Sequence, residues 1–107
     1  MIKANNIIKT KKEYERVNKK LLEAERRGNI IQIFKYKRIV YDYERRLFDI
    51  DIQLCNIYDE VYRSVFIDRY INNMDMELMV DKYRISKSNL YKIVNKAKKQ
   101  FEGSIWQ

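Results

Sequence analysis

Apolar residues recur at alternating intervals of three and four positions through the middle of this chain, and this spacing restricts the fold more than any other feature. The series spans 29 residues and consists of Ile33, Tyr36, Val40, Tyr43, Leu47, Ile50, Leu54, Ile57 and Val61. Such spacing places side chains on one face of an α-helix. A second row, with seven-residue spacing, contains Phe34, Tyr41, Phe48, Cys55 and Tyr62. So wide an apolar sector needs more than one partner helix, from the same chain or from a second copy.

The composition of the remaining chain also favours helices. There is no proline, and the 107 residues include only two glycines. Hydrophobic residues make up 46% and aromatic residues 13%, which is enough for a packed core. We therefore expect an all-α protein. Spacing patterns along the chain further indicate an N-terminal helical hairpin followed by a helix-turn-helix domain.

The hairpin is expected to occupy residues 1–57. Thr10 and Glu13 have the spacing of a capping box, which predicts a first helix over 11–27. Gly28 follows as a residue suited to a left-handed helix end, and the short connection should fold the first helix back onto the second. Two such hairpins can pair as a four-helix bundle, so a homodimer is expected as an alternative to packing within one chain.

The long apolar stripe is expected to break or bend between residues 51 and 58. Beyond the break, residues 58–107 should form the second domain. Its expected helices are Asp59–Asn72, then 76–83 with Asp75 as its cap, and finally 87–102, which stops at Gly103.

Residues 75–102 have the pattern of two helices joined by a tight turn. Four apolar residues are expected to form the contact between these helices: Met79, Tyr83, Leu90 and Val94. Ile85 should fill the corner at the turn, and Ser86 should cap the second helix through its side-chain oxygen. A helix-turn-helix of this kind places its second helix in the major groove of DNA.

The outward face of the second helix carries cationic, polar and aromatic side chains. The predicted DNA-binding residues are Lys87, Ser88, Asn89, Tyr91, Lys92, Asn95, Lys96 and Lys99. Asn89 is the candidate for base readout, because a carboxamide can pair with adenine through two hydrogen bonds. The early lysines suit guanine or phosphate, and the later ones suit backbone phosphates.

The charge distribution agrees with a polyanionic partner. The formal net charge is +8, and the excess of Lys and Arg lies in residues 1–27 and 82–107. The intervening segment is mildly acidic. Basic ends favour contact with double-stranded DNA, although a solvated basic surface on a small helical protein has the same composition.

One segment resembles a known family. Tyr62-Arg63 and Arg69-Tyr70-Ile71, followed by Met79-Val-Asp-Lys-Tyr-Arg-Ile-Ser86-Lys-Ser-Asn-Leu-Tyr91-Lys, are similar to the region 4 helix-turn-helix of sigma factors. The match is closer to the small phage-encoded regulators of the ArpU/RinA type, and it covers roughly residues 50–102. The resemblance implies a sequence-specific transcriptional regulator, a phage or prophage late-gene activator, with RNA polymerase as a further partner.

Three positions depart from the family pattern. Val80 stands where alanine is usual, at the closest approach of the two helices, and Leu78 replaces a usual acidic residue. Arg84 replaces a frequent turn glycine, which implies either a left-handed arginine or a different turn.

Two other functions are compatible with the same sequence. One is the DNA-recognition small subunit of a phage terminase, which would assemble as a ring. The other is a protein-interaction module, such as an anti-repressor or an RNA-polymerase-binding factor, which keeps the helix-turn-helix shape without binding DNA.

Several residue types argue against an enzyme, a cofactor or a metal site. The chain has no histidine, and its single cysteine, Cys55, is expected to be a buried, inert thiol. Carboxylates such as Asp68 are expected on solvated helix faces or as caps. No apolar run is long enough for a membrane span, so the expected location is the cytoplasm of a bacterial host. Near the end of the chain, Trp106 should fold back onto the core or dock on a second subunit.

Overall fold

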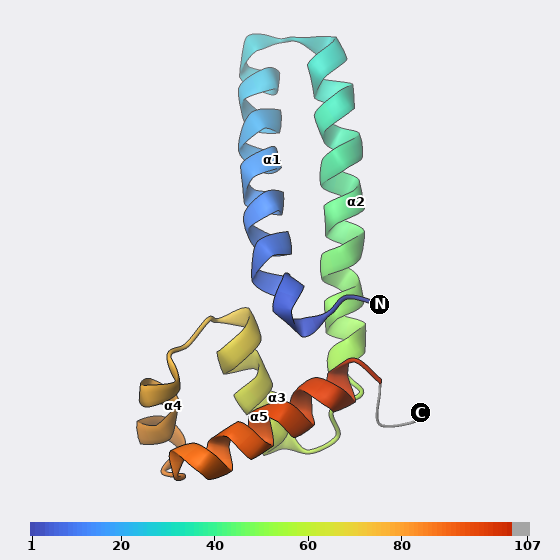
Figure 1. Cartoon of the computed structure of the whole chain (residues 1–107). Helices are drawn as coiled ribbons and strands as arrows, with labels where there is room; N and C mark the ends of the chain where they lie inside the picture. Colours follow the sequence, from blue (N-terminus) through green and yellow to red (C-terminus); the bar gives the residue numbers. More distant parts are fainter. Residues whose placement is uncertain (104–107) are drawn as a thin grey trace.

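Two long helices stand side by side as an antiparallel hairpin, and three shorter helices gather at one end of it (Figure 1). The computed structural model describes residues 1–103. The hairpin consists of α1 (Ile7–Arg27) and α2 (Ile30–Leu54). The shorter elements are α3 (Glu60–Phe66), the π-helical turn η2 (Ile67–Ile71), α4 (Met76–Tyr83) and α5 (Lys87–Phe101). The described residues form helices and no strand, which confirms the all-α prediction.

The hairpin closes where the sequence predicted. Gly28 adopts a left-handed conformation with φ of 70°, and its N–H donates to the Glu25 carbonyl at 3.1 Å. The Asn29 side chain then accepts a hydrogen bond from the Gln32 N–H at 3.2 Å and begins α2. The two helices pack through a small cluster of buried residues, Val17, Leu21 and Val40.

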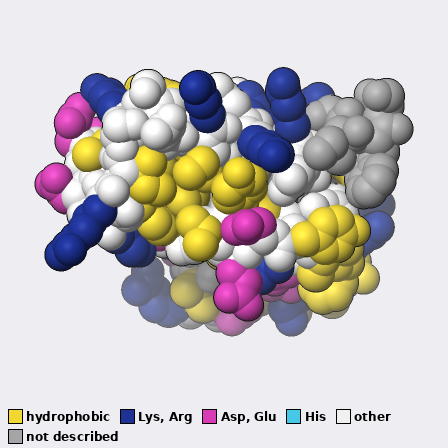
Figure 2. All heavy atoms as spheres, turned by 90° about the horizontal axis from the view of Figure 1, so that it is seen from below, with side chains coloured by type: hydrophobic (Ala, Val, Ile, Leu, Met, Phe, Trp, Pro, Cys, Tyr) yellow, Lys and Arg dark blue, Asp and Glu magenta, His cyan; other side chains and the backbone are white. Residues whose placement is uncertain are grey.

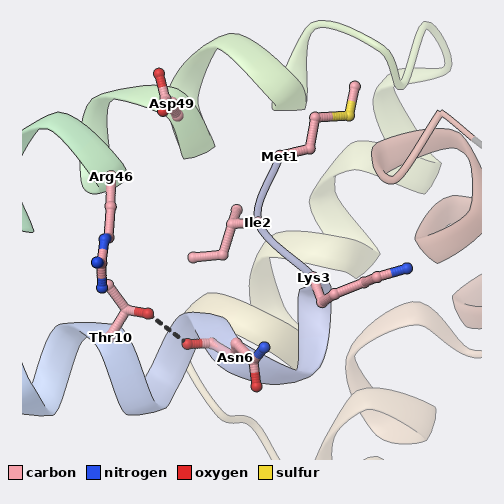
Figure 3. Close-up of a pocket in the computed structure, with 7 residues that line it drawn as sticks. All are labelled: Met1, Ile2, Lys3, Asn6, Thr10, Arg46 and Asp49. Atoms are coloured by element: carbon pink, nitrogen blue, oxygen red, sulfur yellow. Dashed lines mark hydrogen bonds between the residues drawn. The ribbon is translucent and has the colours of Figure 1, made fainter.

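Helix α1 begins earlier than predicted. A short 3-10 helix, η1 (Ala4–Asn6), leads directly into it, and Thr10 lies within α1. The Thr10 hydroxyl donates to the Asn6 carbonyl at 2.7 Å and so does not cap the helix (Figure 3). The predicted capping box is therefore wrong. The reason is tertiary: Ile7 is completely buried in the core, and this burial stabilises the additional helical turn.

Gln53 of α2 joins the first residues of the chain to the end of α5. Its side chain is buried, accepts a hydrogen bond from the Ile2 N–H at 2.9 Å and donates to the Ile2 carbonyl at 3.1 Å. The same amide donates to the Phe101 carbonyl at 3.3 Å. Nearby, the Ala4 N–H donates to the Glu102 carboxylate at 2.9 Å. The N-terminal residues are thus integrated into the end of the molecule where α2 and α5 meet.

The largest core cluster lies at this same end. It combines residues from the N-terminal segment, from the end of α2, and from α3 and α5: Ala4, Ile7, Ile50, Ile57, Phe66, Ala97 and Phe101. The Phe66 ring stacks on Phe101 with 4.4 Å between centroids, and Tyr70 lies 4.9 Å from Phe66. The hairpin and the C-terminal helices therefore share this cluster.

Helix α2 ends at Leu54, within the predicted interval, and a short non-helical connection leads to α3. Asp59 begins α3, and its carboxylate accepts hydrogen bonds from the Val61 and Tyr62 N–H groups at 2.8 and 3.0 Å. The Arg63 guanidinium donates to the Ile57 carbonyl at 2.9 Å across the connection. The break allows Ile57 to enter the core with no exposed surface.

The second apolar row is exposed along α2, and only its last member, Tyr62 of α3, packs against the core. Phe34, Tyr41 and Phe48 are exposed, and so is Cys55. The prediction of a buried Cys55 is therefore wrong. Helix α1 covers only one face of α2, and the row that contains Cys55 lies on another face.

Two further expectations concern membrane spans and Trp106. Within residues 1–103, no helix has the length and hydrophobicity needed to cross a bilayer. Trp106 lies outside the described residues.

Candidate nucleic-acid interface

Helices α4 and α5 pack against each other and against α3 through one apolar cluster. Its buried residues are Val65, Met76, Met79, Leu90 and Val94, and Tyr83 and Val80 lie partly buried at its margin. The predicted contact through Met79, Tyr83, Leu90 and Val94 is confirmed. This cluster positions α5 so that its opposite face points to solvent.

The turn between α4 and α5 contains a left-handed arginine. Arg84 has φ of 54° and ψ of 44°, and its N–H donates to the Val80 carbonyl at 2.9 Å. A non-glycine residue pays roughly 1–2 kcal/mol for this conformation, so packing of the helices on both sides must hold it. Ser86 caps α5 as predicted, since its hydroxyl accepts from the Asn89 N–H at 3.4 Å. Asp75 precedes α4 as expected but makes no side-chain capping bond.

A buried carboxylate fixes α4 relative to α3 and η2. Only 5% of Asp68 is exposed, and it accepts hydrogen bonds from the Tyr83 hydroxyl at 2.5 Å and from the Lys82 ammonium at 2.8 Å. The Asn72 amide donates to its other oxygen at 3.3 Å. Tyr83 is in turn 2.7 Å from the Ser64 hydroxyl. The network links three elements around the base of α5.

The expectation that Asp68 lies on a solvated helix face is wrong. Asp68 follows the buried residue Val65 by three positions, so it lies on the same helix face. That spacing was the available signal in the sequence. The partners Lys82 and Tyr83 come from α4, and only the folded chain brings them to the carboxylate.

The network also changes the proton affinity of Asp68. Burial by itself raises the pKa of this carboxyl, but the hydrogen bonds from Lys82, Tyr83 and Asn72 outweigh burial and lower the pKa below its ordinary value. A lowered carboxyl pKa contributes stability above the unfolded-state pKa of about 4, and this stability is lost as the pH falls through the folded-state pKa.

We predict that Asp68→Asn lowers the free energy of unfolding at neutral pH by about 1.5–3 kcal/mol, because a charged hydrogen-bond acceptor is removed from a buried site. The difference from the native chain should shrink as the pH falls below about 4. Urea denaturation at a series of pH values measures both effects. Asp81→Asn, a change at an exposed carboxylate of α4, is the control. An equal loss in the two variants would refute the role assigned to Asp68.

The structure brings all eight predicted DNA-binding residues to the exposed surface of α5. They are Lys87, Ser88, Asn89, Tyr91, Lys92, Asn95, Lys96 and Lys99. With about 100° between successive residues, Ser88, Lys92, Asn95 and Lys99 lie along the middle of the outward face. Their exposure leaves this strip of α5 accessible to a ligand.

The remaining four residues lie along the two edges of that face. Lys87 and Tyr91 share the edge near α4, where the Lys87 ammonium contacts the Glu77 carboxylate at 2.7 Å. The hydrogen bond to Glu77 raises the pKa of Lys87, so this lysine stays protonated but is partly neutralised. Asn89 and Lys96 share the edge near α3, and the Lys96 ammonium lies 5.6 Å from the centre of the Tyr62 ring.

The charge of α5 is of one sign. Residues 87–101 include five lysines and no acidic residue. The whole end of the molecule is more mixed: Figure 2 shows hydrophobic side chains gathered between Lys and Arg side chains, with acidic groups beside them. Exposed apolar residues of this end are Tyr58, Val61, Leu78 and Tyr91.

A pocket near the N-terminus offers a different type of surface. It is lined by Met1, Ile2, Lys3, Asn6, Thr10, Arg46 and Asp49 (Figure 3). Its charged residues are two cations and one carboxylate. Among residues 1–103, no three metal-ligating side chains are grouped closely enough to hold an ion.

Comparison of the chain with protein-family models, with curated proteins and with solved structures gives no match in any of the three. The resemblance to ArpU/RinA-type regulators therefore remains an expectation from the sequence. The geometry of α5 and its neighbours is the basis for inferring a function.

Proposed function

We propose that this protein binds double-stranded DNA in a sequence-specific manner and regulates transcription. One observation carries the proposal: α5 is a well-packed helix whose outward face displays eight cationic, amide, hydroxyl and aromatic side chains, with no acidic residue from 87 to 101. An α-helix fits the major groove of B-form DNA, and such side chains hydrogen-bond to phosphates and base edges.

The parts of the α5 face would act differently. Lys92 lies in the middle of the face, where it could read guanine or hold a phosphate, and Lys99, in the last turn of α5, would contact the DNA backbone. Asn89 is in the first turn of α5, the region from which recognition helices usually reach bases. Its amide supports readout of adenine. Helix α4, held by Asp68 and the apolar cluster, would lie across the DNA backbone.

The finer assignment is a phage or prophage late-gene activator that also contacts RNA polymerase. Its support is the resemblance of the "YR…RYI" helix and the following helix-turn-helix segment to ArpU/RinA-type regulators. The cytoplasm of a bacterial host is the corresponding location.

Selection of binding sites from a genomic DNA library, followed by gel shifts at two salt concentrations, tests the proposal. We expect one preferred duplex sequence, bound more weakly as salt increases, because lysines release counterions when they contact phosphates. If no duplex is bound near physiological ionic strength, the proposal is refuted.

Two substitutions separate base readout from phosphate contact. Asn89→Ala should reduce discrimination between the preferred sequence and its single-base variants by about 1–3 kcal/mol at one position. Lys96→Ala should weaken binding to all sequences alike. It should also reduce the slope of log binding constant against log salt concentration by about one, which corresponds to the loss of one phosphate contact. Equal effects of the two changes on preference and on affinity would contradict the assigned groove face.

A protein-interaction module is the second candidate. The observation in its favour is the apolar side chains that are exposed at the same end of the molecule (Figure 2), where Tyr58, Val61 and Leu78 are each at least half exposed. Exposed apolar patches commonly mark protein contacts. If the protein is an interaction module, Leu78→Ser should abolish its effect on transcription and Lys92→Ala should leave that effect unchanged. If it regulates transcription by binding DNA, Lys92→Ala should be the more damaging of the two changes.

A further inference from the structure

One face of α2 carries an apolar row that no described part of the chain covers. This outer row consists of Ile30, Phe34, Tyr41, Phe48 and Ile52. Each of these side chains is between 54% and 69% exposed. Figure 1 shows α1 on one side of α2 and no described helix on the side that faces away from α1. The outer row lies roughly 130° around α2 from the residues that contact α1.

Single exposed apolar residues are common, but five of them aligned along one face of a helix, with charged residues on both edges, indicate an interface. Three of the five side chains are aromatic, and aromatic residues are enriched in the centres of protein interfaces. We therefore expect the outer row to bind a protein partner.

The spacing of the outer row identifies that partner. Relative to Tyr41, its members lie at positions −11, −7, 0, +7 and +11. The row is thus symmetric about Tyr41. If a second α2 packs in the antiparallel direction with a two-fold axis at Tyr41, then Ile30 faces Ile52, Phe34 faces Phe48, and Tyr41 faces its own equivalent. Isologous interfaces require this kind of self-complementarity.

The charged residues along one edge of the outer row have the same symmetry. Lys37 and Glu44 are exposed and lie at −4 and +3 from Tyr41. In an antiparallel pair, edge residues meet the same edge of the partner, so Lys37 of each copy lies beside Glu44 of the other. One carboxylate oxygen of Glu44 accepts a hydrogen bond from Tyr14 of α1 at 3.3 Å, so this edge of the outer row is the one that borders α1.

The opposite edge carries charges of both signs. Arg38 and Arg45 approach each other across the two-fold axis, and each is followed four residues later by an aspartate, Asp42 or Asp49. The repulsion between the arginines is reduced because an aspartate of the same helix lies one turn away from each guanidinium. This edge is less favourable than the Lys37–Glu44 edge, so the net electrostatic preference comes from the latter.

We propose that the protein forms an antiparallel homodimer through the outer row of α2. The four long helices form a curved layer in which the two α2 helices are central and the two α1 helices flank them. The C-terminal helices of the two copies lie at opposite ends of this layer. Self-association through the outer row does not depend on whether the protein binds DNA.

The association state and the effect of Tyr41→Glu test the interface. Light scattering coupled to size exclusion should give the mass of two full-length chains, and Tyr41→Glu, which places two carboxylates at the two-fold axis, should weaken association by more than about 100-fold. Leu22→Glu, an equally exposed apolar position on α1, is the matched control and should leave the dimer intact. A monomer at every concentration, a larger ring, or a dimer that tolerates Tyr41→Glu overturns the proposal.

Charge exchange tests the predicted register. Lys37→Glu should weaken the dimer about tenfold, because two attractive contacts become repulsive. Adding Glu44→Lys to the same chain should restore the affinity. Circular dichroism of each variant checks that α1 and α2 remain helical. If the second change weakens the dimer further, Lys37 and Glu44 do not face each other and the register is wrong.

Disulfide trapping tests the direction of the helices in a Cys55→Ser background. Chains with Phe34→Cys and chains with Phe48→Cys, distinguished by size, should cross-link to each other and not to themselves. Tyr41→Cys chains should cross-link to themselves and serve as the positive control. Self-cross-linking of the Phe34→Cys chains would show a parallel pair and would overturn the antiparallel arrangement.

Discussion

Phe66→Ala is expected to lower the free energy of unfolding by about 3–5 kcal/mol, the largest stability loss that we predict for a single substitution. Phe66 has no exposed surface. Its ring stacks on Phe101 of α5 at 4.4 Å and lies 4.9 Å from Tyr70. Removal of the ring would leave a cavity in the cluster of described residues that joins the N-terminal segment, the end of α2 and the C-terminal helices.

Urea denaturation followed by circular dichroism measures this loss. Native and variant chains must be compared at one protein concentration, because any self-association contributes to the apparent stability. Tyr58→Ala is the matched control, since it removes an aromatic ring that is exposed, and it should change stability by less than about 0.5 kcal/mol. A loss below about 1 kcal/mol for Phe66→Ala would show that the shared cluster does not hold the two parts of the chain together.

Reversal of two charges on α5 is expected to have the largest effect on the proposed function. The double variant Lys92→Glu/Lys96→Glu should weaken binding to the preferred duplex by at least about 100-fold and should reduce the salt dependence by about two phosphate contacts. Each reversal removes an attractive charge and places a carboxylate beside the phosphate backbone. Both lysines are exposed, so the fold should tolerate the change.

A second double variant separates a local effect from one of net charge. Lys19→Glu/Lys20→Glu changes the total charge by the same amount at two exposed positions of α1. If α5 is the DNA-binding helix, this variant should retain most of the affinity for the preferred duplex. Equal losses in the two double variants would mean that DNA is attracted by the net positive charge of the molecule and not by the face of α5.

Local patterns in the sequence predicted the helices well where the determining residues are close together in the chain. Gly28, Asp59 and Ser86 each end or begin a helix at the expected place, because a left-handed glycine or a capping oxygen acts within a few residues. The outward face of α5 followed from the same periodicity that predicted its buried face. The bounds of α4, Met76–Tyr83, agree with the predicted 76–83.

The wrong predictions have a common cause. Thr10 has the pattern of a cap, yet the burial of Ile7 extends α1 beyond it. Cys55 belongs to an apolar row, yet no described helix covers that row. Asp68 is a charged residue that becomes buried, because Lys82 and Tyr83 arrive from a distant segment to bind it. In each case the environment is made by residues far away in the chain.

The sequence by itself determined that the chain is helical, where its helices meet, and which face of α5 is polar and cationic, because these properties depend on spacings of a few residues. Only the tertiary structure decided which of the two apolar rows of α2 is buried and how α4 is held. Both rows are compatible with a helix core, and the choice depends on where α1 and the C-terminal helices pack. The row left exposed on α2 and the buried carboxylate of Asp68 are the direct consequences of that packing.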